Sequence, residues 1–164
     1  MDAINELDRA AFVERFGPLF EHSPWVAEAA WRDRPFADRE ELYEALVAAM
    51  YAAPRERKLA LIRAHPDLAG KAAIEGTLTD RSRREQASAG LDRLTPDEYA
   101  AFTSTNEAYR KRFGFPLVVC VRRHTKESIL RVAGERLGNG EDEEIRVALA
   151  EIAKIARLRL EDAL

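Results

Sequence analysis

Residues 95–121 read TPDEYAAFTSTNEAYRKRFGFPLVVCV, and this stretch predicts the fold class. Its opening, Thr95-Pro96-Asp97-Glu98, places an N-cap residue before a first-turn proline and a capping-box glutamate. This combination is typical of a helix start. Apolar and aromatic side chains then recur at helical spacing until Gly114, where we expect the helix to end.

The next residues, Phe115-Pro116-Leu117-Val118-Val119-Cys120-Val121, are apolar and rich in β-branched side chains, as in a buried strand. A sheet needs partner strands, and no other part of the sequence predicts one convincingly. We therefore expect an extended segment that passes through a helical core. Its backbone amides and carbonyls need hydrogen-bond partners, for which a bound ligand, neighbouring side chains and water are the alternatives.

Helix signals recur along the rest of the chain. The predicted starts are Ser23-Pro24, Asp38-Arg39-Glu40-Glu41, Pro54 and Thr125, and a long terminal helix is expected from Glu141 to Leu160. No internal repeat or linker-like run divides the sequence. We predict an all-α fold in a single domain spanning residues 1–164. It should be a bundle of about eight to nine helices with one extended apolar segment near 115–121.

The composition of the 164 residues is that of an ordinary globular domain, with 46% hydrophobic and 34% charged residues and a net charge of -3. Lysine and arginine are dispersed among acids, so neither nucleic acid nor a membrane surface is an expected partner. Cys120 is the only cysteine, which excludes an intrachain disulfide and a cysteine metal cage. No signal-peptide pattern and no run of roughly 20 apolar residues is present. We expect a cytoplasmic protein.

The dipeptide His65-Pro66 is the first candidate for chemistry. Histidine exchanges protons near neutral pH, and a following proline disfavours helical geometry at the histidine. The imidazole is therefore expected at a helix boundary. The alternative is that His65 is structural and that the residues after it only begin a helix. His22 and His124 are weaker candidates, beside a helix start and in a turn.

The run Ser82-Arg83-Arg84-Glu85-Gln86 is the second candidate. Ser82, Glu85 and Gln86 share one face if the run is helical. Two interpretations stay open. Ser82 and Glu85 form a capping box, or Thr79 and Asp80 cap the helix and leave both side chains for a ligand.

Three other observations bear on the kind of site. Asn106 falls in the middle of a predicted helix, where asparagine has no propensity advantage, which hints at a buried polar role. Cys120 lies in an apolar run and is interpreted as a core residue. The three histidines lack metal-ligand spacing, so no metal site is expected.

These motifs together resemble the 2-oxo-4-hydroxy-4-carboxy-5-ureidoimidazoline (OHCU) decarboxylase family of urate breakdown. The resemblance lies in His65 to Lys71 (HPDLAGK), Ser82 to Leu91 (SRREQASAGL) and Asn106 to Pro116 (NEAYRKRFGFP). Phe16-Gly17 and Trp31 to Phe36 (WRDRPF) resemble the family as well, so the likeness covers nearly the whole chain.

The resemblance implies an all-α homodimer that uses no metal or organic cofactor. It implies conversion of OHCU to (S)-allantoin and carbon dioxide, the last step from urate to allantoin. It also implies hydroxyisourate hydrolase, another enzyme of the same pathway, as a possible partner. The alternatives are a helical ureido-ligand-binding module, or a related lyase or hydrolase acting on another ureido compound.

Carried over by position, the resemblance makes His65 the catalytic histidine and Glu85 its acidic partner across the site. The backbone of the extended segment would bind the ring and ureido atoms of the substrate. Two departures, Leu117 in place of a common aromatic and Arg123 in place of a frequent glycine, put the shape of the pocket in question. The implied substrate contacts are Pro66, Ser82, Arg83, Arg84, Glu85, Gln86, Leu117, Val118, Val119, Cys120 and Val121.

The substrate explains why no cofactor is expected. Loss of carbon dioxide leaves an electron pair that the adjacent imine-type ring can delocalise, so no external electron sink is required. The remaining tasks are to orient the carboxylate, exclude water and deliver one proton to one face. We expect His65 to be the general acid, with Glu85 orienting the substrate hydroxyl or exchanging its proton.

Overall fold

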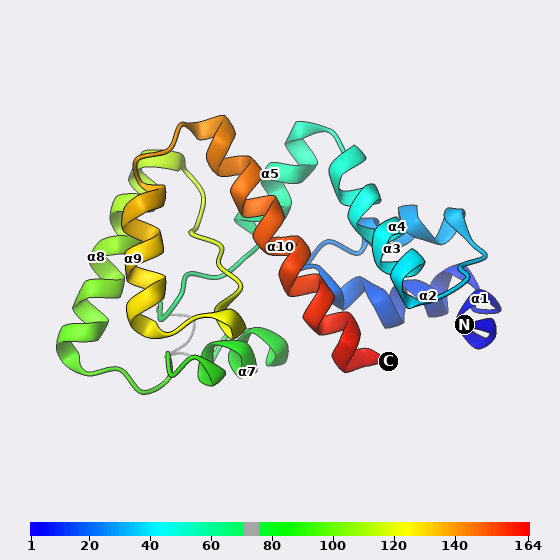
Figure 1. The fold of residues 1–164 in the computed structure, drawn as a ribbon, viewed down its shortest axis with the longest axis horizontal. Coiled ribbons are helices and arrows are strands. Elements are labelled where there is room, and N and C mark those ends of the chain that lie inside the picture. Colours follow the sequence, from blue (N-terminus) through cyan, green and yellow to red (C-terminus); the bar gives the residue numbers. More distant parts are fainter. Residues whose placement is uncertain (71–75) are drawn as a thin grey trace. The chain divides into compact units, whose positions relative to one another are not determined.

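The computed structural model describes residues 1–70 and 76–164. Within these residues every regular element is helical, which confirms the predicted all-α class. The chain divides into two compact units, Met1–Ala64 with Ile152–Leu164, and His65–Glu151 (Figure 1). The long helix α10 (Glu141–Ala163) contributes to both. The prediction of a single domain stays a prediction. None of the described helices is long and apolar enough to span a bilayer.

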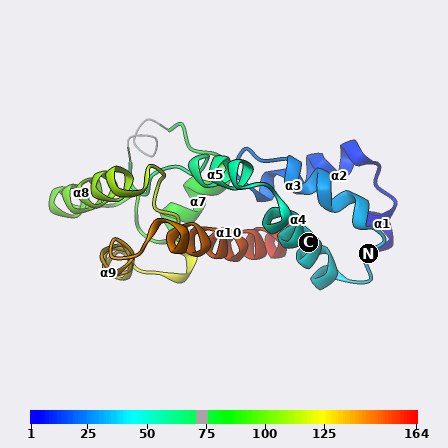
Figure 2. The same ribbon diagram turned by 90° about the horizontal axis from the view of Figure 1, so that it is seen from above.

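The first unit is a cluster of short helices around aromatic side chains. Phe12 and Phe16 are fully buried, with ring centroids 4.7 Å apart, and helix α3 packs against both α2 and α4 (Figure 2). Arg159, near the end of α10, forms a buried ion pair of 2.9 Å with Glu21. Besides the end of α10, the elements of this unit are α1 (Asp2–Asn5), α2 (Arg9–Phe16), η1 (Gly17–Leu19), α3 (Trp25–Ala30), η2 (Trp31–Asp33), α4 (Arg39–Ala52) and α5 (Arg55–Arg63).

Two predicted helix starts in this unit have different outcomes. Asp38 caps α4 as predicted, because its carboxylate accepts a hydrogen bond from the Glu41 amide at 3.0 Å. The prediction that Ser23 caps α3 is wrong. The Ser23 hydroxyl instead donates to the Glu21 carbonyl at 2.8 Å, and Pro24 occupies the cap position. The chain turns before α3, so the Ser23 hydroxyl bonds to an earlier residue and not to an amide in the first turn of the helix.

The second unit contains α7 (Asp80–Ser88), α8 (Pro96–Phe113), η3 (Val121–Arg123), α9 (Lys126–Arg136) and the first part of α10. Helix α8 begins with the predicted capping box between Thr95 and Glu98. It ends at Gly114, whose φ of 74° is a left-handed conformation that glycine adopts without steric cost. Thr125 caps α9 as predicted, and α8 and α9 pack against each other (Figure 1).

The segment between α8 and η3 is buried and has no regular secondary structure, as predicted for the apolar run 115–121. It is anchored at its start by aromatic packing. The ring of Phe115 lies 5.8 Å from that of Phe113 and 6.0 Å from that of Tyr109. The side chains of residues 117–120 are each 3% exposed or less. The segment therefore passes through the core of the second unit rather than over its surface.

Candidate active site

His65 lies at a helix boundary, as its following proline predicts. Helix α5 ends at Arg63, Ala64 is the C-cap residue, and His65 follows outside the helix with 8% of its surface exposed. The imidazole is thus nearly enclosed, on a non-helical piece of chain. The residues immediately after it form a loop that is held by side chains of two helices.

Gln86 holds the backbone of the loop that follows His65. Its side-chain oxygen accepts a hydrogen bond from the Ala69 amide at 3.0 Å, and its side-chain nitrogen donates to the Asp67 carbonyl at 3.3 Å. Ala69 has a φ of 52°, an uncommon conformation for a residue with a Cβ atom, of the kind found where surrounding contacts fix the backbone. The amide of Gln86 therefore fixes this loop, whereas its predicted contact with substrate stays a prediction.

Helix α8 holds the same loop from another direction. The side-chain amide of Asn106 donates to the Leu68 carbonyl at 2.8 Å. One turn later, the Arg110 guanidinium contacts the Asp67 carboxylate at 2.8 Å. The mid-helix position of Asn106 signals this role in the sequence, and the structure confirms that its amide is used. Lys71, the last residue of the predicted motif, lies outside the described residues.

Helix α7 is capped by Thr79, which decides between the two interpretations of Ser82 and Glu85. The Thr79 hydroxyl accepts a hydrogen bond from the Ser82 amide at 3.2 Å. Ser82 is therefore inside the helix, where its side chain is 5% exposed, and Glu85 is not the glutamate of a capping box. Glu85 is half-buried. Both side chains are placed on a face that is turned inward.

Arg83 and Arg84 are on the exposed part of α7. Arg83 pairs with Asp80 one turn earlier and lines a cavity of about 380 Å³ between α7 and the start of α8. The Arg83 guanidinium is therefore paired at the surface and is not enclosed with a substrate carboxylate. Their predicted role as substrate contacts is untested by the geometry, and Ser82 and Glu85 are better placed.

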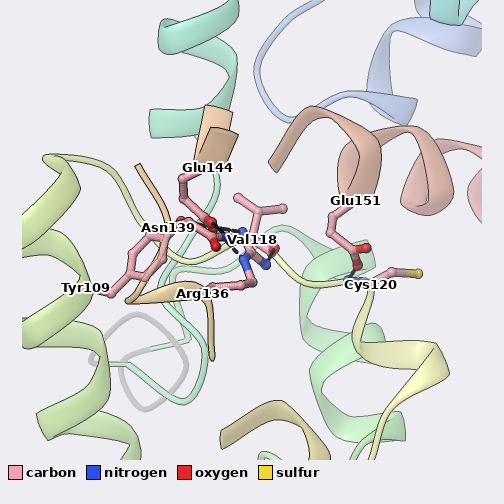
Figure 3. Close-up of polar contacts among 7 residues, drawn as sticks. All are labelled: Tyr109, Val118, Cys120, Arg136, Asn139, Glu144 and Glu151. Atoms are coloured by element: carbon pink, nitrogen blue, oxygen red, sulfur yellow. Dashed lines mark hydrogen bonds and ion pairs between the residues drawn. The ribbon is translucent and has the colours of Figure 1, made fainter. Parts of the chain in front are cut away.

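The extended segment meets α7 through η3, which packs against that helix. Helix α7 thus touches both the loop after His65 and the end of the apolar segment. Two backbone groups of the segment are occupied by side chains. The Val118 carbonyl accepts from Arg136 at 2.6 Å, and the Cys120 amide donates to Glu151 at 2.8 Å (Figure 3). For these two groups the partners are neighbouring side chains, one of the alternatives that the sequence left open. The predicted substrate contacts of residues 117–121 stay a prediction.

A buried polar cluster lies behind this segment. Glu144 is fully buried and pairs with Arg136, and it accepts hydrogen bonds from the Tyr109 hydroxyl and from the Asn139 amide (Figure 3). Burial, reinforced by the hydrogen bond to Glu144, raises the pKa of Tyr109 far above its usual value. The tyrosine therefore stays protonated and donates to the carboxylate.

The sequence does not reveal this cluster. Arg136 and Glu144 are in the last turn of α9 and the first turn of α10, where charges of these signs are expected simply because they interact well with the helix dipole. Glu144 also ends a run of four acids that resembles a solvated face. Nothing in the sequence marks one acid of four as the buried one.

Among the described residues, no group of three or more histidine, cysteine, aspartate or glutamate side chains is arranged to hold a metal ion. The expectation that the reaction needs neither metal nor organic cofactor rests on the chemistry of the substrate and stays a prediction.

Comparison with known proteins places these features in a family. A family model described as OHCU decarboxylase matches residues 5–161. The chain belongs to the OHCU decarboxylase family. The 2-oxo-4-hydroxy-4-carboxy-5-ureidoimidazoline decarboxylase of Haloferax volcanii is 44% identical over 160 residues, which cover 98% of this chain and 93% of that protein.

Two longer proteins contain a region similar to this OHCU decarboxylase family member. A uric acid degradation bifunctional protein of Bacillus subtilis is 40% identical over 162 residues, covering 99% of this chain and 32% of that protein. The crystal structure of an (S)-allantoin synthase superposes with a TM-score of 0.79 at 30% identity. It matches 99% of this chain, which spans about half (53%) of the synthase chain. The family is thus found both as a separate chain and within larger proteins.

Proposed function

We propose that this chain decarboxylates OHCU to (S)-allantoin and carbon dioxide, with His65 as the proton donor. Membership of the OHCU decarboxylase family supports the reaction, and the (S)-allantoin synthase with the same fold supports the handedness. The observation that carries the role of His65 is its position. It is an enclosed imidazole just past a helix end, and the loop after it is fixed by the side chains of Gln86, Asn106 and Arg110.

The proposed reaction breaks the bond between the carboxylate carbon and the ring. Carbon dioxide leaves, and the electron pair moves through the ring carbon that bears the ureido group to the neighbouring ring nitrogen, which takes up a proton. His65 then protonates that carbon on one face, and the substrate hydroxyl loses its proton and becomes the ring carbonyl. One proton is consumed in total by the carboxylate form of the substrate. A general acid of this kind contributes about 10²–10⁴-fold to the rate.

Glu85 is assigned to the substrate hydroxyl. Glu85 is half-buried on α7 and is not part of a capping box. Its carboxylate lies on the same inward face of the helix as Ser82. A carboxylate there orients the hydroxyl and accepts its proton. Ser82 and the backbone of the extended segment supply the remaining hydrogen bonds, while Pro66 and Leu117 to Val121 enclose the ring.

The proposal extends to the assembly and the location of the protein. The protein is proposed to be cytoplasmic and, as the family resemblance implies, a homodimer. Sedimentation equilibrium of the purified chain would test the dimer. The similar region in a bifunctional uric acid degradation protein supports a place beside other enzymes of that route. We propose hydroxyisourate hydrolase as the pathway neighbour.

The reaction is tested by generating OHCU in the cuvette from urate with urate oxidase and hydroxyisourate hydrolase. Circular dichroism then follows the product with and without this chain. Rapid growth of an (S)-allantoin signal is the expected result. Because OHCU decays without enzyme, slow formation of racemic allantoin at an unchanged rate would contradict the proposal.

A further inference from the structure

The buried pair of Arg136 and Glu144 is an unusual way to stabilise a core. Arg136 is 5% exposed and Glu144 is fully buried. Removing two charges from water carries a large penalty, and apolar side chains of similar volume often replace such pairs without loss of stability. Stability alone therefore does not explain why Arg136 and Glu144 are buried together. Their contacts indicate a second role.

The pair connects two helix ends to the backbone of the apolar segment. Arg136 ends α9, Glu144 begins α10, and Asn139 in the turn between them donates to Glu144 at 3.0 Å. The Glu144 carboxylate contacts Nε and Nη2 of the Arg136 guanidinium. The remaining nitrogen, Nη1, donates to the Val118 carbonyl at 2.6 Å (Figure 3). Only the planar fork of arginine spans both partners at once.

A second contact from α10 holds the same edge of the segment. Glu151 accepts from the Cys120 amide at 2.8 Å, and it lies seven residues after Glu144, on the same face of the helix. In an extended chain the backbone groups of residues i and i+2 point to one edge, and those of residue i+1 point to the other. The Val118 carbonyl and the Cys120 amide face these side chains, and an extended backbone between them would turn the groups of Val119 to the opposite edge.

We propose that Arg136 and Glu144 are positioning residues that fix the extended segment so that the backbone of Val119 contacts the substrate. This inference rests on the proposed function, in which the segment forms part of the substrate site. Glu144 acts through Arg136, and Arg136 acts through the Val118 carbonyl. Neither side chain takes part in proton transfer, so their effect falls on substrate and product binding.

The test is the double variant Arg136→Met/Glu144→Gln, with Arg131→Met/Glu135→Gln as the matched control. The double variant leaves no buried unpaired charge, and the side-chain oxygen of glutamine keeps an acceptor for Tyr109, but the Val118 carbonyl loses its donor. The control removes an exposed pair of the same residue types from α9, the helix that carries Arg136. Both are assayed for KM and kcat with OHCU and for the Kd of (S)-allantoin by calorimetry.

We expect the double variant to raise KM and the Kd of (S)-allantoin by on the order of ten-fold, the effect of one misplaced hydrogen bond, with kcat changed less. The control should match wild type. A purely structural role would lower the folded fraction, and hence the apparent kcat, while KM and Kd stayed the same. That result would overturn the proposal.

Arg136→Lys provides a second test if the double variant does not fold. Lysine keeps the charge beside Glu144 but cannot span to Val118 at the same time, so KM and Kd should again rise. Unchanged values, or failure of both variants to fold at 25 °C, would overturn the positioning role. The proposed function has a separate control, because a wild-type protein that does not accelerate OHCU loss would contradict that function before any variant is compared.

Discussion

The side-chain amide of Asn106 donates a hydrogen bond to the carbonyl of Leu68 at 2.8 Å, and Leu68 lies three residues after His65. This contact joins the middle of α8 to the loop that carries the candidate catalytic histidine. Together with Gln86 on α7 it fixes a loop that contains Ala69 in a left-handed conformation. Two helices therefore fix the loop that follows His65.

Replacing Asn106 with leucine should impair both stability and turnover. The Leu68 carbonyl would lose its donor in a buried position, which costs about 1–3 kcal/mol. The looser loop should lower kcat, because His65 would no longer be held in place. Urea unfolding and the circular dichroism assay measure the two effects. Ser104→Leu, an exposed position on the same helix, serves as the control, and an unchanged kcat in Asn106→Leu would show that the loop does not depend on this contact.

Thr79→Ala and Ser82→Ala should separate capping from substrate contact. Thr79 caps α7, so its loss should reduce the free energy of unfolding by about 0.5–2 kcal/mol while the KM for OHCU stays the same. Ser82 is a buried hydroxyl within the helix, and its loss should reduce kcat/KM by up to about ten-fold, the value of one hydrogen bond. The reverse pattern would mean that Ser82 is the structural residue of the two.

The fold class could be predicted because the signals for it are local. The capping box at Thr95 and Glu98, the glycine stop at 114 and the cap at Thr125 each act within one turn of helix, and the structure places all of them as expected. The prediction that Ser23 caps α3 is wrong because this signal, too, is only local. A serine before a proline suits an N-cap, but its hydroxyl had an equally local alternative in the Glu21 carbonyl.

The site could be predicted less completely, because its support comes from distant residues. His65 and Ser82 were identifiable from motif and spacing. That Gln86 would bind the loop at Asp67 and Ala69, nineteen and seventeen residues away, depends on tertiary packing. The pairing of Arg136 with Glu144 was hidden because charges at helix ends are ordinarily explained by the helix dipole.

Glu85→Gln should slow the reaction by about 10²–10⁴-fold if the carboxylate exchanges the hydroxyl proton. Glutamine keeps the size and hydrogen-bonding capacity of the side chain, so the main effect should be on kcat. Glu127→Gln, an exposed acid on α9, is the control. A change confined to KM would limit Glu85 to orienting the substrate.

Alkaline pH should reveal the environment of Tyr109. Its pKa is raised above 10.0 in the folded protein by burial and by Glu144, whereas the unfolded chain titrates at its ordinary value. The folded state therefore binds the proton more tightly. The stabilisation is fully present below pH 10 and decreases as the pH rises above it, by up to about 1.4 kcal/mol per pH unit.

Tyr109→Phe removes this group and should show a shallower loss of stability with pH. The comparison uses urea unfolding of both proteins between about pH 9 and 11, where the other tyrosines and the lysines titrate equally in each. Parallel curves for the two proteins would indicate that the phenol is not held in a buried contact with Glu144.

The role of His65 as the proton donor is tested by comparing His65→Asn with His22→Asn in the OHCU assay. His22 is exposed and has a φ of 46°, a conformation that asparagine tolerates, so its replacement should leave activity and handedness unchanged. His65→Asn should remain folded, slow the enzymatic rate by at least about 10²-fold, and leave mainly racemic allantoin from spontaneous decay. Rapid formation of (S)-allantoin by a folded His65→Asn protein would contradict the assignment of His65 as the proton donor.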